Sequence, residues 1–284
     1  MSIVTRFAPS PTGRLHLGHV LSACIAQDLA RNSSEGKFLL RMEDIDASRV
    51  RPEHEAGIIE DLEWLGLKWD GEILRQSERH DAYQHALHLL QAMGLVYPCF
   101  CTRKEIQTEI KAMGGAPHDQ EVVYPGTCRN LSACEREARI AAGETHAWRL
   151  DSKRTAERVG PLTFEDAHRG KIEVNPDILG DVVISRRDIG VAYHLAVVVD
   201  DAHQKISLVS RGEDLLPSTH VHRLLQAALN LTEPSYHHHH LLLDKNGKRL
   251  TKRYDALSIE SLRRSGKDAS EILEQITSLA LRPR

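Results

Sequence analysis

The sequence predicts an α/β protein built on a doubly wound parallel sheet. Segments of strand character alternate with segments of helical periodicity over the first hundred residues. A Pro/Gly-rich turn at residues 8–13 ends the first strand and leads into the first helix. The chain has 284 residues, of which 41% are hydrophobic, so it can bury a large core without disulfides. Because consecutive parallel strands need helical crossovers, this alternation favours one sheet covered by helices on both faces.

The expected elements follow one another closely up to residue 93. Helices are assigned where apolar residues recur at helical spacing, and strands where short apolar runs end at turns or acidic residues. The expected strands are 2–7 and 37–42, and the expected helices are 18–30, one beginning after Pro52, and about 79–93.

The segment 97–186 breaks this rhythm with four cysteines and short strand-like pieces at 147–150 and 181–184. We therefore expect an α+β insertion there. Beyond it, the apolar run 192–199 (AYHLAVVV) predicts a buried central strand, followed by a strand at 206–210 and a helix at about 218–229. The tract His237 to His240 runs directly into leucines, which favours a partly exposed strand or loop over a tag.

Three regions result from this division. Residues 1–96 and 187–230 form a discontinuous α/β domain, 97–186 form the insertion, and 231–284 form a short C-terminal segment. The whole chain contains 37 Lys and Arg residues against 40 Asp and Glu residues, which excludes a globally basic nucleic-acid-binding protein. The segment 245–267, however, contains eight basic and only two acidic residues. This local basic strip is a candidate RNA contact.

The sequence contains neither a secretion signal nor an apolar run near the roughly 20 residues that span a membrane. Its five cysteines are too few and too scattered for a disulfide scaffold. Reduced thiols are typical of a cytoplasmic protein, and we expect this location.

The first motif with a chemical meaning is His16-Leu17-Gly18-His19, at the start of the first expected helix. A helix N-terminus offers free N–H groups and a positive dipole to phosphate. His16 and His19 lie on one helical face, where they can stabilise charge developing on a phosphate. Gly18 leaves room for a planar base against the backbone. A chance histidine pair on an ordinary helix is the alternative, which the turn-and-helix setting disfavours.

A second motif, residues 245–253 (KNGKRLTKR), is a basic loop that contains a glycine. Lysine is a mobile point charge suited to a triphosphate whose charge shifts during reaction. Alone, the loop fits a solvated turn or a polynucleotide contact equally well.

Together, HLGH and RLTKR resemble the paired signatures of class I aminoacyl-tRNA synthetases. The segments RFAPSPTGRLHLGH, RMEDID, YHLAVVVDD and SRGEDLLPST, in this order, resemble the glutamyl-tRNA synthetase family from residue 6 to about 253. The resemblance implies a Rossmann-type catalytic domain and ATP with Mg²⁺ as a substrate. It implies catalytic roles for His16, His19 and Lys252, and ATP binding by these three with Pro9 and Gly18. The second signature departs from the usual lysine-first form, because Arg249 opens it and Arg253 closes it.

The same resemblance implies a site for L-glutamate. Arg6 and Arg211 would face its carboxylates, where a planar guanidinium can bind bidentately. Glu43 would hold its ammonium group, with an ion pair between Arg6 and Glu43 as the alternative. Tyr193 would add a hydroxyl to the wall unless it belongs to the core. The full implied set is Arg6, Ala8, Ser10, Glu43, Tyr193 and Arg211.

The cysteines of the insertion predict a metal site. Cys99, Cys101 and Cys128 offer three thiolates, one ligand short of a tetrahedral structural zinc. Tyr124, four residues before Cys128, resembles the tyrosine of a zinc site found in one branch of the family, which implies Tyr124 as the fourth ligand. His118 and Cys134 remain alternatives, as does a set of buried cysteines without metal.

Only 31 residues follow Arg253, too few for a helical anticodon-binding domain, and we expect none. With the tyrosine-bearing pattern, this resembles the truncated branch that attaches glutamate to queuosine in the anticodon loop of tRNA(Asp). The implied reaction is tRNA-independent formation of glutamyl-adenylate, then transfer to queuosine, with no membrane or obligatory protein partner. The alternatives are a truncated enzyme that charges a conventional tRNA 3′ end and an inactive RNA-binding paralogue.

Overall fold

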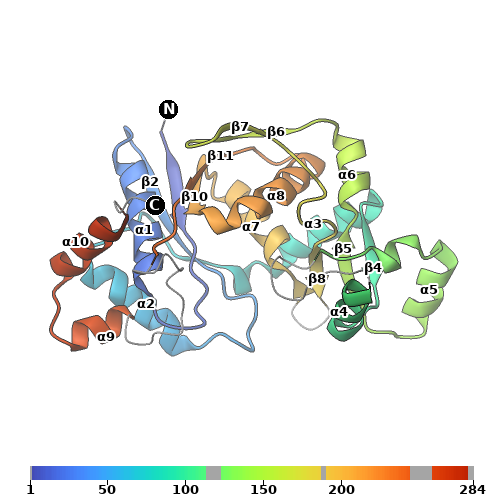
Figure 1. The fold of residues 1–284 in the computed structure, drawn as a ribbon, viewed down its shortest axis with the longest axis horizontal. Coiled ribbons are helices and arrows are strands. Elements are labelled where there is room, and N and C mark those ends of the chain that lie inside the picture. The colour runs from blue at the N-terminus through green and yellow to red at the C-terminus, as the bar shows by residue number, and fades with distance from the viewer. Residues whose placement is uncertain (1, 113–122, 187–189, 244–257, 281–284) are drawn as a thin grey trace.

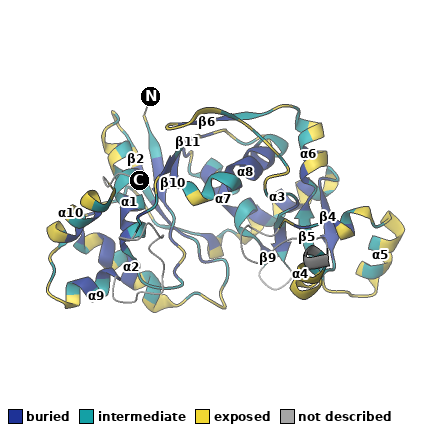
Figure 2. Cartoon of the chain, viewed as in Figure 1, coloured by how far each residue is buried: buried dark blue, intermediate teal, exposed yellow. Residues whose placement is uncertain are grey.

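The protein is described by a computed structural model over residues 2–112, 123–186, 190–243 and 258–280. Its strands form three hydrogen-bonded sheets with helices around them (Figure 1). Figure 2 shows that the helices and strands near the middle of the molecule are the most buried, while α5 (Ala133–Ala141) is exposed over much of its surface. None of the helices in the described ranges is both long and apolar enough to cross a membrane.

Two of the sheets contain the parallel strands that the sequence predicts. The first has the order β1 (Val4–Phe7), β2 (Lys37–Met42) and β3 (Leu74–Arg75), all parallel. The second has the order β10 (Leu208–Gly212), β11 (Ser235–His239), β6 (Thr163–Asp166) and β7 (Gly170–Glu173), and only β7 is antiparallel. The histidine tract thus lies largely in a strand, as expected.

The parallel strands do not form the single sheet that we expected. β1 and β10 lie side by side, with the Ser207 N–H donating to the Val4 carbonyl at 3.0 Å, but they share no ladder of their own. Arg6 reaches the Ser210 carbonyl further along, so both strands run in the same direction. The carboxyl ends of β1, β2 and β10 therefore open on one side, where ligands bind in α/β folds.

A third sheet is antiparallel and contains only some of the strands of the expected insertion, because β6 and β7 belong to the second sheet. Its order is β4 (Val96–Cys99), β5 (Ala147–Leu150), β8 (Val183–Arg186) and β9 (Gly190–Val191). The remaining helices of at least six residues are α1 (Leu17–Arg31), α2 (Pro52–Trp64), α3 (His80–Ala92), α4 (Arg103–Ala112), α6 (Ser152–Val159), α7 (Tyr193–His203), α8 (Leu216–Ala228), α9 (Ile259–Arg264) and α10 (Ala269–Ala280).

The prediction of a buried strand at 192–199 was wrong, because this segment forms the first part of α7. Its core-facing residues include Leu195, Ala196, Val197 and Val198, all at most 1% exposed. A helix buried on nearly every side has the same unbroken apolar run as a central parallel strand, so periodicity does not separate the two.

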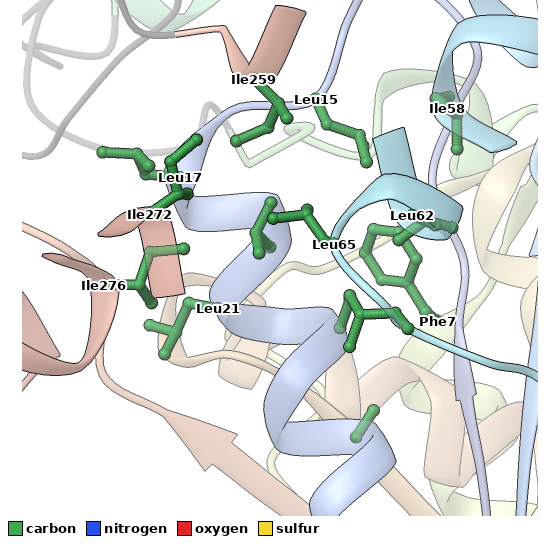
Figure 3. Close-up of a cluster of buried hydrophobic side chains, with 14 of the residues drawn as sticks. Phe7, Leu15, Leu17, Leu21, Ile58, Leu62, Leu65, Ile259, Ile272 and Ile276 are labelled. Carbon is green, nitrogen blue, oxygen red and sulfur yellow. The ribbon is translucent and has the colours of Figure 1, made fainter. Parts of the chain in front are cut away.

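Two hydrophobic clusters flank the open side of the sheets. One surrounds α1 and joins it to α2, α9 and α10 through Leu62, Ile259, Ile272 and Ile276 (Figure 3). The other joins α3, α7 and α8 with β4, β5 and β8. Phe7 belongs to the first cluster, so elements far apart in the sequence hold the end of β1 in place.

Candidate active site

A cleft of about 1170 Å³ lies at the carboxyl ends of β1, β2 and β10. It gathers every expected ATP and glutamate residue that the structure describes: Arg6, Ala8, Pro9, Ser10, His16, Gly18, His19, Glu43, Tyr193 and Arg211. Lys252, Arg249 and Arg253 lie outside the described residues. Segments of the chain more than 200 residues apart therefore meet in one site.

The first signature forms the cleft wall at the start of α1. His16 is the residue that precedes the helix, and the rings of His16 and His19 stack with their centroids 4.9 Å apart. The His16 N–H donates to Nδ1 of His19 at 3.2 Å, which holds the second ring over the helix start. No atom lies within 4 Å of a Cβ built on Gly18, so this position leaves open space in the cleft. The geometry suits a nucleotide phosphate at the helix N-terminus.

The C-terminal segment docks directly beside this wall. The Ile259 N–H donates to the Leu15 carbonyl at 3.0 Å, and Arg14 Nε lies 2.7 Å from Glu260 Oε2. Ser258 pairs with His16, and Leu242 lines the cleft. The described flanks of the segment that carries the second signature thus both lie at the cleft.

Arg6 is held by an ion pair that the sequence did not predict. Its Nε donates to Asp201 Oδ1 at 2.9 Å, and Asp201 also accepts from Arg41 Nη2 at 2.5 Å. Burial alone would raise the pKa of Asp201, but the two guanidinium groups hold it below its ordinary value. Arg6 therefore pairs with Asp201 in α7 and not with Glu43, the partner we had considered.

The position of Asp201 could have been predicted from the sequence if residues 192–199 had been assigned to a helix and not to a strand. In a helix, Tyr193, Val197 and Asp201 recur every four residues, so Tyr193 and Asp201 lie near one face. Tyr193 lines the cleft, and its hydroxyl lies 3.4 Å from Arg211 Nη1. A helical interpretation would have placed a carboxylate beside the expected amino-acid pocket.

Glu43 follows β2 and is half-buried at the cleft wall. Burial raises its pKa to about 7, although Arg41 and Arg6 oppose the shift by favouring the charged form. A carboxyl group that titrates near neutral pH in a cleft is a functional-site candidate.

Arg211 enters the cleft from β10 and is surrounded by neutral groups. Its nitrogens lie 2.6 Å from Thr219 Oγ1, 3.2 Å from His222 Nδ1 and 3.3 Å from His238 Nε2. Sequence analysis placed none of these three partners in the cleft, although His238 lies in the histidine tract that it noted. Thr219 and His222 lie on α8 and His238 on β11, and no short-range pattern links them to Arg211.

The three predicted cysteine ligands converge at the end of β4. The sulfurs of Cys99, Cys101 and Cys128 all lie within 4.8 Å of one another, and those of Cys101 and Cys128 are 3.4 Å apart. A tetrahedral zinc with Zn–S bonds of about 2.3 Å separates its sulfurs by about 3.8 Å. The cluster is therefore the right size for such an ion.

Tyr124, the fourth ligand that the resemblance implied, lies beside this group. Its Oη lies 3.4 Å from Cys101 Sγ and accepts the Cys128 N–H at 2.9 Å, and the Arg149 guanidinium lies 3.9 Å from its ring centroid. Burial and hydrogen bonds with the neighbouring cysteines raise the pKa of Tyr124 above its ordinary value, so the phenolate would need a bound cation to offset this shift. Cys134 is exposed on α5 and does not belong to the converging group, and His118 lies outside the described residues.

Residues 2–283 match the family model described as the catalytic domain of class I tRNA synthetases (E and Q). The chain belongs to this family. It therefore has the catalytic domain of a ligase, and class I synthetases use ATP with Mg²⁺.

Relatives of this class I domain fall into two kinds. The chain is 46% identical to the glutamyl-Q tRNA(Asp) synthetase of Rhodobacter capsulatus, covering 95% of this chain and 98% of that protein. It is 40% identical to glutamate–tRNA ligase 2 of Syntrophus aciditrophicus, covering 92% of this chain but 54% of that protein. Among solved structures, a glutamate tRNA ligase from Elizabethkingia meningosepticum in complex with its amino acid superposes with a TM-score of 0.75 at 33% identity, covering 89% of this chain and 52% of that one.

Proposed function

We propose that the chain activates L-glutamate with ATP and Mg²⁺ to glutamyl-adenylate, then transfers the glutamyl group to queuosine at the wobble position of tRNA(Asp). The observation that carries the first step is the meeting of a histidine-bearing helix start with Arg211 and Glu43 in one cleft. The second step rests on similarity to glutamyl-Q tRNA(Asp) synthetases, such as that of R. capsulatus, matched over 98% of its length.

In this proposal the amino-acid half of the cleft orients glutamate. Arg6 and Arg211 bind its carboxylates, and ionised Glu43 binds its ammonium group. Ser10, Tyr193 and the backbone of Ala8 complete the wall. Holding the α-carboxylate beside the α-phosphate converts a bimolecular attack into a positioned one.

The nucleotide half stabilises the reacting phosphate. Pro9 and Gly18 leave the nucleotide access to the backbone, and His16 and His19 donate to phosphate oxygens at the start of α1. We assign Lys252 to the same task from its signature sequence. The carboxylate oxygen of glutamate forms a bond to the α-phosphorus, and the bond to pyrophosphate breaks.

The second step is the attack of a queuosine hydroxyl on the carbonyl carbon of the mixed anhydride. The C–O bond to AMP breaks, the hydroxyl proton passes to the phosphate of the leaving AMP, and an ester remains on the base. An anticodon loop suits such a site because its single-stranded bases can be splayed out of the stack.

We also propose that Cys99, Cys101, Tyr124 and Cys128 hold one structural Zn²⁺. Three sulfurs and a phenol oxygen converge from β4, the loop after it and the segment before α5, so a bound ion would tie these pieces together. The ion has no part in the reaction steps above.

The experiment that tests the acceptor is a paired charging assay. Labelled glutamate, ATP and Mg²⁺ are incubated with tRNA(Asp) that contains queuosine and with the same tRNA without it. We expect labelled RNA only with queuosine, and nuclease mapping should place the alkali-sensitive label in the anticodon loop. Equal labelling of both tRNAs would reject the proposal.

One alternative has specific support, because relatives such as that of S. aciditrophicus are named glutamate–tRNA ligases. A label mapped to the 3′-terminal nucleotide would favour that activity. Glutamate-dependent ATP–pyrophosphate exchange separates both enzymes from an inactive RNA-binding paralogue, which would show none.

A further inference from the structure

The two arginines of the cleft differ in how their charge is compensated. Arg6 is paired with Asp201 at 2.9 Å. Arg211 is only 6% exposed, yet no carboxylate of the described residues lies within 4.0 Å of its nitrogens. A buried cation without a counter-ion is costly, and an anionic ligand would offset that cost.

The neighbours of Arg211 fix its guanidinium without neutralising it. Nε donates to His238 Nε2 at 3.3 Å, Nη2 to Thr219 Oγ1 at 2.6 Å, and Nη1 to both His222 Nδ1 at 3.2 Å and Tyr193 Oη at 3.4 Å. All of these acceptors are neutral in the states described below. The guanidinium is therefore held in one orientation while its positive charge stays available.

The hydrogen bonds determine which nitrogen of each histidine carries the proton. A guanidinium only donates, so His238 Nε2 and His222 Nδ1 must each present a lone pair to Arg211. The proton of His238 then lies on Nδ1, which is 2.7 Å from Asp166 Oδ2. The proton of His222 lies on Nε2, which is 3.2 Å from His194 Nδ1.

Burial keeps both rings in these neutral states. It lowers the pKa of His238 to about 4 even though Asp166 opposes the shift, and it lowers the pKa of His222 well below its ordinary value. Both rings are at most 2% exposed. They stay neutral at the pH of an ordinary assay, and neither adds a positive charge beside Arg211.

We propose that His222 and His238 are positioning residues that aim the uncompensated charge of Arg211 at a carboxylate of the amino-acid substrate, and that His194 and Asp166 set their tautomers. This inference rests on the proposed activation of glutamate for the identity of the ligand. It assigns a role in substrate affinity to four residues that lie behind the cleft wall and do not touch the reacting atoms.

Paired substitutions test this role by glutamate-dependent ATP–pyrophosphate exchange. His222→Leu and His238→Leu remove the acceptor from Arg211, and each should raise KM for glutamate about tenfold to hundredfold, as expected for a lost hydrogen bond to a charged group. KM for ATP should stay within about twofold, because the loss concerns amino-acid binding alone. His222→Asn and His238→Gln, which return an oxygen acceptor near the lost nitrogen, should recover most of the affinity.

His220 supplies a matched control on the same helix. It is 5% exposed, its Nδ1 accepts the Asn175 N–H at 3.1 Å, and its ring packs edge-on against Phe164. His220→Asn should leave KM for glutamate unchanged. If the leucine variants fold and keep the wild-type KM, or if His220→Asn raises KM as much as they do, the proposal is wrong.

A spectroscopic readout separates this inference from the proposed function. In protein labelled with ¹⁵N-histidine, the His238 ring is identified as the signal that vanishes in His238→Gln, and we expect it to be protonated at Nδ1 and bare at Nε2. Finding His238 protonated at Nε2 would overturn the positioning role. If the wild-type protein shows the expected tautomers but no glutamate-dependent exchange, glutamate is not the substrate. The hydrogen-bond arrangement around Arg211 would still be supported.

Discussion

Single side chains in the cleft are tuned by groups from distant elements, and Glu43 shows the consequence most directly. Its carboxyl group leaves water at the end of β2, and burial raises its pKa to about 7. Binding an ammonium group needs the ionised carboxylate, but burial disfavours that form. Ionised Glu43 therefore lowers the stability of the folded protein but places a negative charge where the ammonium group would bind.

The kcat/KM for glutamate should therefore rise with pH through about 7. Below that pH Glu43 of the free enzyme is protonated and cannot pair with the ammonium group, and kcat/KM reports the free enzyme. The measurement is glutamate-dependent exchange between about pH 6 and 8. Glu43→Gln should lower the rate and remove this pH dependence. A wild-type profile that is flat across this range would contradict the assignment.

Glu43→Gln should lower the reaction rate but raise the stability of the folded protein. A carboxyl whose folded pKa lies above its unfolded value stabilises the protein at low pH, and this contribution is lost as pH rises through the folded pKa of about 7. Glu43→Gln should then melt at a higher temperature than the wild type at pH 8. At pH 5 the two should melt much closer together.

Among secondary-structure elements, the sequence predicted those whose pattern is local. The strand 37–42 coincides with β2, and the helix expected at 18–30 is α1 (Leu17–Arg31) within one residue at each end. The helix α7 was missed because its apolar residues occupy nearly the whole circumference. The amphipathic contrast that identifies α3 is weaker in such a segment.

The cysteines at the end of β4 and in the loop that follows it are predicted to bind zinc. Purified protein should contain one zinc ion per chain, and Cys101→Ala should lose it because three ligands remain where four are needed. Cys134→Ala is the control, since Cys134 is exposed and outside the converging group. Metal analysis of freshly purified protein provides the measurement. Zinc retained in Cys101→Ala, or absent from the wild type, would exclude the site.

Tyr124→Phe separates the two candidate fourth ligands. It keeps the buried ring but removes the Oη that lies 3.4 Å from Cys101 Sγ. A lowered zinc affinity would support Tyr124, whereas an unchanged one would return the fourth position to His118.

At the scale of the whole molecule, the C-terminal helices hold the helix that begins with the first signature. Ile259 and Ile272 are 0% exposed and pack with Leu17 and Leu21 of α1 (Figure 3). Residues more than 240 positions apart thus form one core. Removing part of this core should loosen α1 together with its histidines.

Ile272→Ala should lower the free energy of unfolding by about 2–5 kcal/mol, because a fully buried side chain is replaced by a cavity. Urea denaturation followed by circular dichroism measures the change. Ser278→Ala, on the exposed side of the same helix, should change the stability by less than about 0.5 kcal/mol. Equal effects of the two substitutions would show that α10 does not pack on α1 in solution.

The sequence by itself determined the local elements, the signature at the start of α1, the residues of the cleft and the three cysteines that converge. The local elements follow from spacing along the chain, which the backbone geometry of helices, strands and turns translates into position, whereas the residues of the cleft were implied by the resemblance to a known family. Only the tertiary structure decided that Asp201 pairs with Arg6, that neutral histidines surround Arg211 and that the parallel strands form two sheets. A pattern of burial shows which side chains leave water, whereas their partners depend on how distant elements pack.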